Sequence, residues 1–128
     1  MIYKINTENA PGAIGPYSQA IAVNGFVYTS GQIPLNPSTG EIVSGGVEEQ
    51  TKQALENLKN VLLAAGVDLK DVIKTTVFIK NMNDFPQINK IYGEFFAEPF
   101  PARSCVEVAR LPKDVFVEIE AVAYGEQN

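Results

Sequence analysis

The 128-residue chain carries a formal net charge of −5, and its ten lysines and arginines are scattered along the sequence. Nucleic acid is therefore not an expected partner, because binding to phosphates needs a basic stripe. The lack of histidine and the single cysteine, Cys105, exclude a Ser-His-Asp or Cys-His nucleophile system, a Cys/His zinc site and an intramolecular disulfide within one chain.

Hydrophobic periodicity and turn residues predict six strands and two helices. In chain order these are strands Ile2–Asn6, Ser18–Val23 and Phe26–Ser30, helix Val47–Ala65, strand Val72–Lys80, a helix from Asn83 or Asp84 to about Ala97, and strands Arg103–Ala109 and Val115–Tyr124. Asn24-Gly25 is a strong hairpin signal between the second and third strands. Gly66 suits the end of the first helix, and Asn83 or Asp84 is the expected cap of the second.

This order predicts an α+β fold in which a six-stranded mixed sheet carries both helices on one face, because strand-helix-strand units cross over with one hand. In the fourth strand, four side chains are expected to share a face: Ile73, Thr75, Val77 and Ile79. The last strand alternates an apolar set with a mixed set, Phe116, Glu118, Glu120, Val122 and Tyr124. A mixed, open sheet face suits another copy of the chain, which predicts an oligomer.

The length and the N-terminal sequence set two further expectations. The chain is expected to form one domain, spanning residues 1–128. No apolar run reaches the roughly 18 residues that cross a bilayer, and the N-terminus lacks the basic-then-apolar pattern of a signal peptide. A lone cysteine is typical of a reducing compartment. We therefore expect a cytoplasmic protein without membrane contact.

Three charged residues near the C-terminus are the main candidates for chemistry. Arg103 opens one predicted strand, and Glu118 and Glu120 share a face of the next, with a short turn between them that suggests proximity in space. An arginine fork can clamp a substrate carboxylate through two parallel hydrogen bonds. A partly desolvated glutamate can hold or deprotonate a water. The alternatives are a solvated or glutamate-paired arginine and a solvated sheet face.

Other positions could line a ligand site. Tyr17 lies in a constrained Gly-Pro loop and either lines a pocket or is a buried core residue. Ser30 and Gly31 end a strand, where glycine lets a ligand approach the backbone, or they form a simple turn. Cys105 is expected on the same strand face as Arg103, whose charge would favour the thiolate. Because no histidine partner exists, we interpret this cysteine as lining a pocket rather than as a nucleophile.

Five segments are more specific than any single candidate residue. The most specific is Pro101–Val108, which reads Pro-Ala-Arg-Ser-Cys-Val-Glu-Val, and the others are Glu8–Pro11, Ile14–Ala20, Thr29–Pro34 and Lys74–Phe78. Taken together, these segments resemble the RidA family, also called the YjgF or reactive intermediate/imine deaminase family. The resemblance covers nearly the whole chain.

The resemblance implies a fold similar to chorismate mutase of the trimeric type, with two helices on one face of a six-stranded mixed sheet. Three copies would pack their sheets into a barrel-like homotrimer with a ligand site in each cleft between subunits. Part of each site would then come from a neighbouring subunit. One departure is visible, since residues 97–100 form a shorter segment than in many members. It lies just before Arg103, so a different pocket rim is expected, which leaves the substrate range open but not the site.

The implied activity is hydrolysis of 2-imino acids, and of enamine tautomers such as 2-aminoacrylate, to 2-oxo acids and ammonia. These reactive species leak from pyridoxal-phosphate enzymes, so the implied role is metabolite damage control, with no cofactor or metal in the family protein itself. Arg103 matches the arginine that clamps the substrate carboxylate. Glu118 matches the glutamate that positions the attacking water, with Glu120 as the alternative. The other implied substrate-binding residues are Tyr17, Ser30, Gly31, Asn89 and Cys105.

Two other functions stay open at this point. Some relatives look more like non-catalytic binders of small 2-oxo or amino acids that act as regulatory subunits. A ribonuclease or translation-inhibitor activity is attached to others. The acidic charge and the lack of histidine argue against the ribonuclease.

Overall fold

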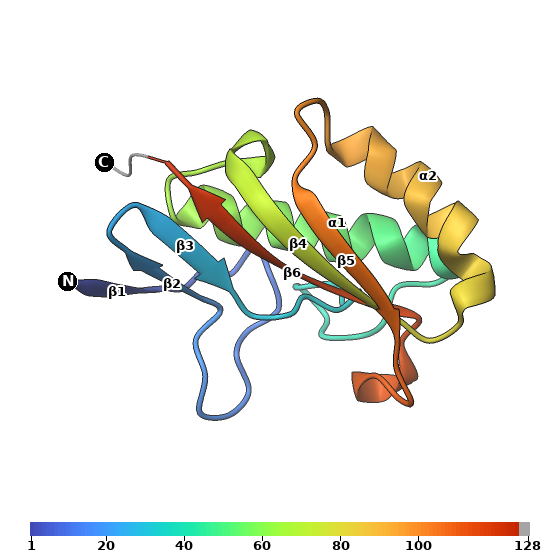
Figure 1. The fold of residues 1–128 in the computed structure, drawn as a ribbon. Helices are drawn as coiled ribbons and strands as arrows, with labels where there is room; N and C mark the ends of the chain where they lie inside the picture. The colour runs from blue at the N-terminus through green and yellow to red at the C-terminus, as the bar shows by residue number, and fades with distance from the viewer. Residues whose placement is uncertain (126–128) are drawn as a thin grey trace.

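Six strands form one mixed sheet, and two α-helices pack against it (Figure 1). The computed structural model describes residues 1–125, so residues 126–128 of the predicted domain lie outside the described residues. The strands are β1 (Ile2–Ile5), β2 (Ala20–Val23), β3 (Phe26–Thr29), β4 (Val72–Ile79), β5 (Ala102–Glu107) and β6 (Val117–Tyr124). The helices are α1 (Val47–Ala64) and α2 (Phe85–Phe95), and the short 3-10 turns are η1 (Leu69–Asp71), η2 (Met82–Asp84) and η3 (Pro112–Asp114). Every predicted helix and strand is present, with small differences at the ends.

The order of strands across the sheet is β1-β2-β3-β6-β4-β5, so the C-terminal strand β6 lies inside the sheet. Strands β4 and β5 are parallel, and the other neighbouring pairs are antiparallel. Strand β4 therefore lies between β5 and β6, although these two are consecutive in the chain (Figure 1). Strands β1 and β5 form the two edges of the sheet.

Both helices cover the same face of the sheet, as the sequence predicted (Figure 1). The predicted alternation along β6 is also confirmed. Its inward residues are buried under the helices, whereas Glu118, Glu120 and Val122 are only partly buried on the opposite face. The largest fully buried side chains of the helices are Leu55, Leu58, Val61, Leu62, Ile88 and Ile91. One apolar core between helices and sheet therefore holds the elements that carry the candidate residues.

Local interactions fix the ends of α1 and tie it to the loop after β3. The Glu49 carboxylate accepts a hydrogen bond from the Gly46 backbone nitrogen (2.8 Å), and this bond holds the pKa of Glu49 below its usual value. Gly66 has a φ of 84°, the left-handed conformation that suits the residue after a helix. Asn57 is fully buried and donates hydrogen bonds to two carbonyl oxygens of the loop after β3, at 3.0 and 2.9 Å. That loop is therefore held firmly against the helix.

The prediction that Ile73 shares a strand face with Thr75, Val77 and Ile79 was wrong for Ile73. Ile73 is 47% exposed, whereas Thr75 is fully buried. The register between β4 and β6 shifts between Val72 and Lys74. Such a bulge inserts one residue into the strand and turns it away from its expected face.

The predicted cap position of the second helix is confirmed, but without the capping hydrogen bond. Asp84 is the residue before α2, and its side chain makes no capping hydrogen bond. The Asn81 side chain accepts a hydrogen bond from the Asn83 backbone nitrogen (2.9 Å) and caps the 3-10 turn η2. The α-helix therefore begins directly after Asp84, as predicted, and a separately capped 3-10 turn precedes it.

The sheet face opposite the helices is open and rich in apolar side chains. Tyr28 is 50% exposed, Val106 42% and Tyr124 53%. Partly buried aromatic residues, Phe26 on β3 and Phe78 on β4, extend the same face. An apolar surface of this kind on a sheet is typical of a contact with another protein chain.

Candidate active site

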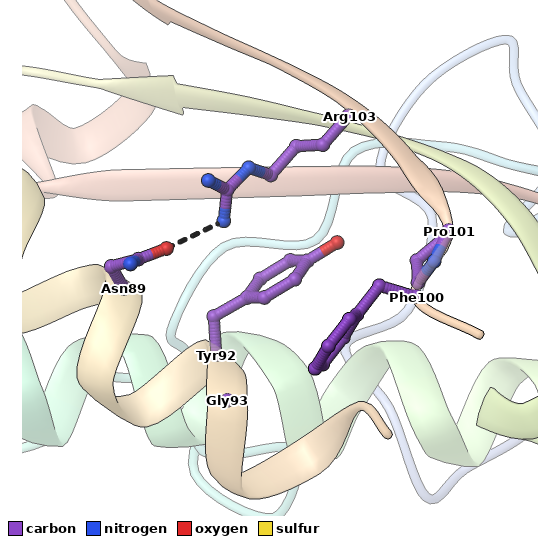
Figure 2. Close-up of a pocket in the computed structure, with 6 residues that line it drawn as sticks. All are labelled: Asn89, Tyr92, Gly93, Phe100, Pro101 and Arg103. Atoms are coloured by element: carbon purple, nitrogen blue, oxygen red, sulfur yellow. Dashed lines mark hydrogen bonds between the residues drawn. The ribbon is translucent and has the colours of Figure 1, made fainter. Parts of the chain in front are cut away.

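The residues singled out from the sequence fall mainly into two cavities. The first, here called the arginine cavity, has a volume of about 440 Å³ and lies between α2 and the start of β5. It is lined by Asn89, Tyr92, Gly93, Phe100, Pro101 and Arg103 (Figure 2). The second, here called the glutamate cavity, has a volume of about 510 Å³, and its lining includes Tyr17, Ser30, Gly31, Lys113 and Glu118.

The Arg103 guanidinium is held by side chains of α2 (Figure 2). Its Nη1 donates a hydrogen bond to Asn89 Oδ1 (2.8 Å). Its Cζ lies 4.7 Å from the centre of the Tyr92 ring and 5.3 Å from that of Phe85, which are cation–π distances. Asn89 is the one hydrogen-bond acceptor that Arg103 meets within residues 1–125. The remaining donors of the fork are thus available to an anion in the cavity.

The glutamate cavity is built from loops that backbone and side-chain hydrogen bonds hold in place. Ser30 Oγ donates to the Ser18 carbonyl oxygen (2.6 Å), which fixes the end of β3. Gln32 and Ile119 exchange two backbone hydrogen bonds, at 2.8 and 3.0 Å. This bridge brings Gly31 directly beside the Glu118 side chain, to the point where a Cβ on residue 31 would overlap the Glu118 carboxylate. Glycine leaves room here for the Glu118 carboxylate, and the reason is space rather than backbone conformation, since its φ is not in the left-handed region.

Glu118 is the carboxylate whose ionisation the fold disfavours. Desolvation on burial raises its pKa above the usual value, and the negative charge of Glu120 raises it further. Glu118 lines the glutamate cavity, whereas Glu120 does not. A carboxyl group with a raised pKa beside a cavity can take up and release protons nearer neutral pH. Of the two candidates from the sequence, Glu118 therefore has the better placement for acid-base chemistry.

The expectation that Arg103 and Glu118 lie close together in one chain was wrong. Strand β4 separates their strands, and Arg103 pairs with Thr75 of β4 whereas Glu118 pairs with Phe78. Arg103 lies on the face that the helices cover, and Glu118 lies on the open face. With strands about 4.8 Å apart and a rise of about 3.3 Å per residue, their Cα atoms are roughly 14 Å apart. The short turn between β5 and β6 passes across β4 and so does not make the two strands neighbours.

Cys105 also differs from its expected chemistry. Burial raises the pKa of its thiol, and the opposing effect of the Arg103 charge is smaller, so the thiolate is not favoured. Its side chain packs against the core, and it lines neither of the two cavities. It does share a strand face with Arg103, as predicted, two residues further along β5. Its place in a substrate pocket remains a prediction.

The sequence reasoning missed two parts of the site. Tyr92 was assigned to the apolar stripe of α2, yet its ring lies under the Arg103 guanidinium. The spacing of three residues from Asn89, which puts both on one helix face, was a signal that could have found it. Lys113 and its neighbour Asp114 both have positive φ, 54° and 57°, in a turn at the rim of the glutamate cavity. No sequence pattern predicted the positive φ angles of this turn, because neither residue is glycine and other residues rarely adopt them.

The described residues contain neither a metal-binding cluster nor a membrane-spanning helix. No group of three or more acidic or cysteine side chains in residues 1–125 is arranged to hold a metal ion. Within the same residues, no helix is both long and apolar enough to cross a membrane.

Comparison with known proteins places this geometry in a family. Residues 7–125 match the family model described as endoribonuclease L-PSP, and matching solved structures include the YjgF gene product of Escherichia coli, at 53% identity. The chain belongs to the RidA/YjgF family. The resemblance read from the sequence is thereby confirmed.

Members of the RidA/YjgF family match this chain over nearly its whole length. A RutC family protein of Pyrococcus horikoshii is 60% identical over 122 residues, which cover 95% of this chain and 97% of the relative. The Escherichia coli K12 protein named 2-iminobutanoate/2-iminopropanoate deaminase is 57% identical over 122 residues, which cover 93% and 94%. The structure of Escherichia coli TdcF with bound serine has a TM-score of 0.91 at 52% identity, covering 97% of this chain and 99% of that one.

The raised pKa of Glu118 gives a first testable prediction for this RidA/YjgF chain. In an NMR titration of the side-chain carboxyl carbons, Glu118 is expected to titrate above the usual pH range of glutamate, because burial disfavours its charged form. Glu120→Gln is expected to lower the midpoint, since it removes a like charge, without restoring the ordinary value. An ordinary midpoint for Glu118 in the wild type would contradict the desolvation argument.

Proposed function

We propose that this protein is a hydrolytic deaminase of 2-imino acids and of their enamine tautomers, such as 2-aminoacrylate, and that it releases 2-oxo acids and ammonia. The observation that carries the proposal is the Arg103 guanidinium, held in a cavity with most of its donors available to a carboxylate. Glu118, with its raised pKa, supplies a group suited to acid-base work on water. The deaminase name of a relative at 57% identity supports the same reaction.

We propose that the complete site forms between copies of the chain. Arg103 and Glu118 lie on opposite faces of the sheet, so a small substrate cannot reach both within one copy. Strand β5, which carries Arg103, is an edge strand, and the open apolar face offers a second copy a surface to bury. The proposed assembly is a homotrimer in which the arginine cavity of one copy faces the glutamate cavity of the next.

In the proposed reaction, Arg103 donates two parallel hydrogen bonds to the substrate carboxylate and fixes the position of the imine carbon. The Glu118 carboxylate of a second copy accepts a proton from water while the water oxygen bonds to that carbon. The imine reacts in its N-protonated form, so the C=N bond becomes a C–N single bond and the tetrahedral product carries both a hydroxyl and an amino group. The proton held by Glu118 then passes to that amino group, ammonia leaves, and the hydroxyl returns its proton to Glu118 or to ammonia as the C=O bond of the 2-oxo acid forms. One water is consumed, and no electrons are exchanged.

The remaining positions implied by the family surround these two groups in the proposal. Tyr17, Ser30 and Gly31 belong to the glutamate side, where the cavity wall they form would enclose the water and the reacting carbon. Asn89 belongs to the arginine side, where it holds one nitrogen of the fork. Cys105 is proposed as a neutral neighbour of the carboxylate site. Such a reaction would remove reactive imines released by pyridoxal-phosphate enzymes.

The direct test generates an imine in place with an amino-acid oxidase and lets semicarbazide compete for it. The wild type is expected to speed the release of ammonia and 2-oxo acid and to lower the yield of semicarbazone. Arg103→Ala is expected to behave like buffer. If the wild type also behaves like buffer with several different imines, the deaminase proposal is wrong.

Gly31→Ala tests the contact between the backbone and Glu118. The added methyl group would overlap the Glu118 carboxylate and push it from its place, so the rate is expected to fall by about 10- to 100-fold. Stability is expected to change little, because the displaced group is the mobile end of a side chain. Gly12→Ala is the matched control, since it lies in the same cavity wall with no atom within 4 Å of the new Cβ. Equal loss in both variants, measured as kcat/KM, would overturn this role for Gly31.

One alternative function has an observation in its favour. The TdcF structure holds serine, an amino acid with a carboxylate, so a relative binds a ligand of this class. A non-catalytic binder of small 2-oxo or amino acids would show ligand-induced thermal stabilisation that depends on Arg103, with no turnover of any imine. The family description as an endoribonuclease gains no support from this chain's charge of −5 and lack of histidine.

A further inference from the structure

Tyr92 connects the core of the sheet to the arginine cavity through a hydrogen bond on one side and a cation–π contact on the other. Tyr92 is 5% exposed, and Thr75, on β4, is fully buried. The Tyr92 hydroxyl and Thr75 Oγ1 are 2.7 Å apart and form a hydrogen bond. A buried phenol and a buried hydroxyl each need a partner, and here each one satisfies the other. The hydrogen bond to Thr75 therefore anchors the hydroxyl end of the Tyr92 ring to strand β4.

The same ring is fixed from the side. The rings of Tyr92 and Phe96 are 4.5 Å apart, and Phe96 is itself 5% exposed. Thr75 is the residue that pairs with Arg103 in the parallel register of β4 and β5, so both side chains rise from adjacent strands on one face. The ring that Thr75 anchors is thus the ring on which the Arg103 guanidinium lies, at 4.7 Å (Figure 2).

Two of the α2 side chains that contact Arg103 constrain it in different ways. The Tyr92 ring lies under the guanidinium carbon at 4.7 Å, whereas Asn89, one helical turn earlier, accepts a hydrogen bond from Nη1 at 2.8 Å. An exposed arginine otherwise samples many rotamers, and binding must freeze them. A fork held in place before the ligand arrives loses less freedom on binding.

We infer that Tyr92, anchored by Thr75, is a positioning residue that holds Arg103 ready for a carboxylate. This inference rests on the proposed function only in that both require Arg103 to bind the substrate carboxylate. It predicts that the aromatic ring of residue 92 sets the affinity for carboxylate ligands, separately from its contribution to the core. The chemical step, which depends on Glu118, is not expected to depend on this ring.

The test compares Tyr92→Leu, Tyr92→Phe and Phe96→Leu by calorimetric titration with 2-oxobutanoate and by kinetics with the corresponding imine. Tyr92→Leu removes the ring and is expected to raise Kd and KM by about tenfold with little change in kcat. Tyr92→Phe keeps the ring but loses the hydrogen bond that anchors it to Thr75, so its Kd is expected to lie between those of the wild type and Tyr92→Leu, within about threefold of the wild type. Phe96→Leu is the matched control, because it is equally buried and contacts Tyr92 but not Arg103. It should lower thermal stability but leave Kd unchanged.

A wild-type Kd in Tyr92→Leu, or an equal loss of affinity in Phe96→Leu, would overturn the inference. A lowered kcat at unchanged KM in Tyr92→Leu would do so as well. If the wild type turns over no imine but the pattern in Kd holds, the deaminase proposal fails and the positioning role stands. If the wild type binds no 2-oxobutanoate at all, both are wrong.

Discussion

Arg103→Ala is expected to lower kcat/KM for imine hydrolysis by about 10²–10⁴-fold, because two charge-assisted hydrogen bonds to the substrate carboxylate disappear together with the orientation they impose. The fold and the oligomer are expected to survive. The side chain is exposed and lies at the edge of the sheet, and its one hydrogen bond within residues 1–125 joins it to an exposed asparagine. Steady-state kinetics and size-exclusion chromatography measure the two effects separately.

Arg103→Lys is the matched control for this variant. It keeps the positive charge but loses the planar fork, so its activity is expected to lie between those of the wild type and Arg103→Ala. An Arg103→Ala protein with wild-type kcat/KM would show that another group binds the carboxylate. A lysine variant as active as the wild type would show that charge alone is sufficient.

Glu118→Gln is expected to lower kcat by about 10²–10⁴-fold with little change in KM, because the amide cannot accept a proton from water. The free energy of unfolding near neutral pH is expected to stay the same or rise. The sign follows from the raised pKa, since a folded state that disfavours the ionised carboxyl loses stability above the unfolded-state pKa, and glutamine avoids that loss. Kinetics and denaturant unfolding measure both quantities.

Glu120→Gln is the matched control, since Glu120 lies two residues further along the same face but does not line the glutamate cavity. Its kcat at neutral pH is expected to change little. If Glu120→Gln loses the activity and Glu118→Gln keeps it, the water belongs to Glu120. Comparable losses in both variants would mean that the pair acts as a unit.

Most of the fold could be predicted from local sequence patterns, because the elements are strongly periodic. Residues 47–65 repeat apolar side chains with helical spacing, and β6 alternates so regularly that its buried face was identified residue by residue. The exceptions, the bulge at Ile73 and the cap at Asn81, depend on a register shift and on one tight turn of backbone. Neither leaves a periodic signal.

The site was predicted less completely, because its geometry depends on strand order. The sequence indicated Arg103 and Glu118 individually, and the family resemblance indicated their roles. The short turn between their strands suggested contact, but β4 lies between β5 and β6, and the pairing register puts the two side chains on opposite faces. Tyr92 escaped notice because it was assigned to the apolar stripe of α2, and its spacing of three residues from Asn89 was not used.

The central claim, that one active site draws Arg103 and Glu118 from different copies, is tested most directly by mixing two inactive variants. Arg103→Ala and Glu118→Gln chains are refolded together in equal amounts. One quarter of the clefts between copies then combine an intact Arg103 from one copy with an intact Glu118 from the next. The account predicts that the mixture recovers about one quarter of the wild-type kcat per site, although each variant alone is inactive. A mixture no more active than the separate variants, with chain exchange confirmed by mass spectrometry, would contradict it.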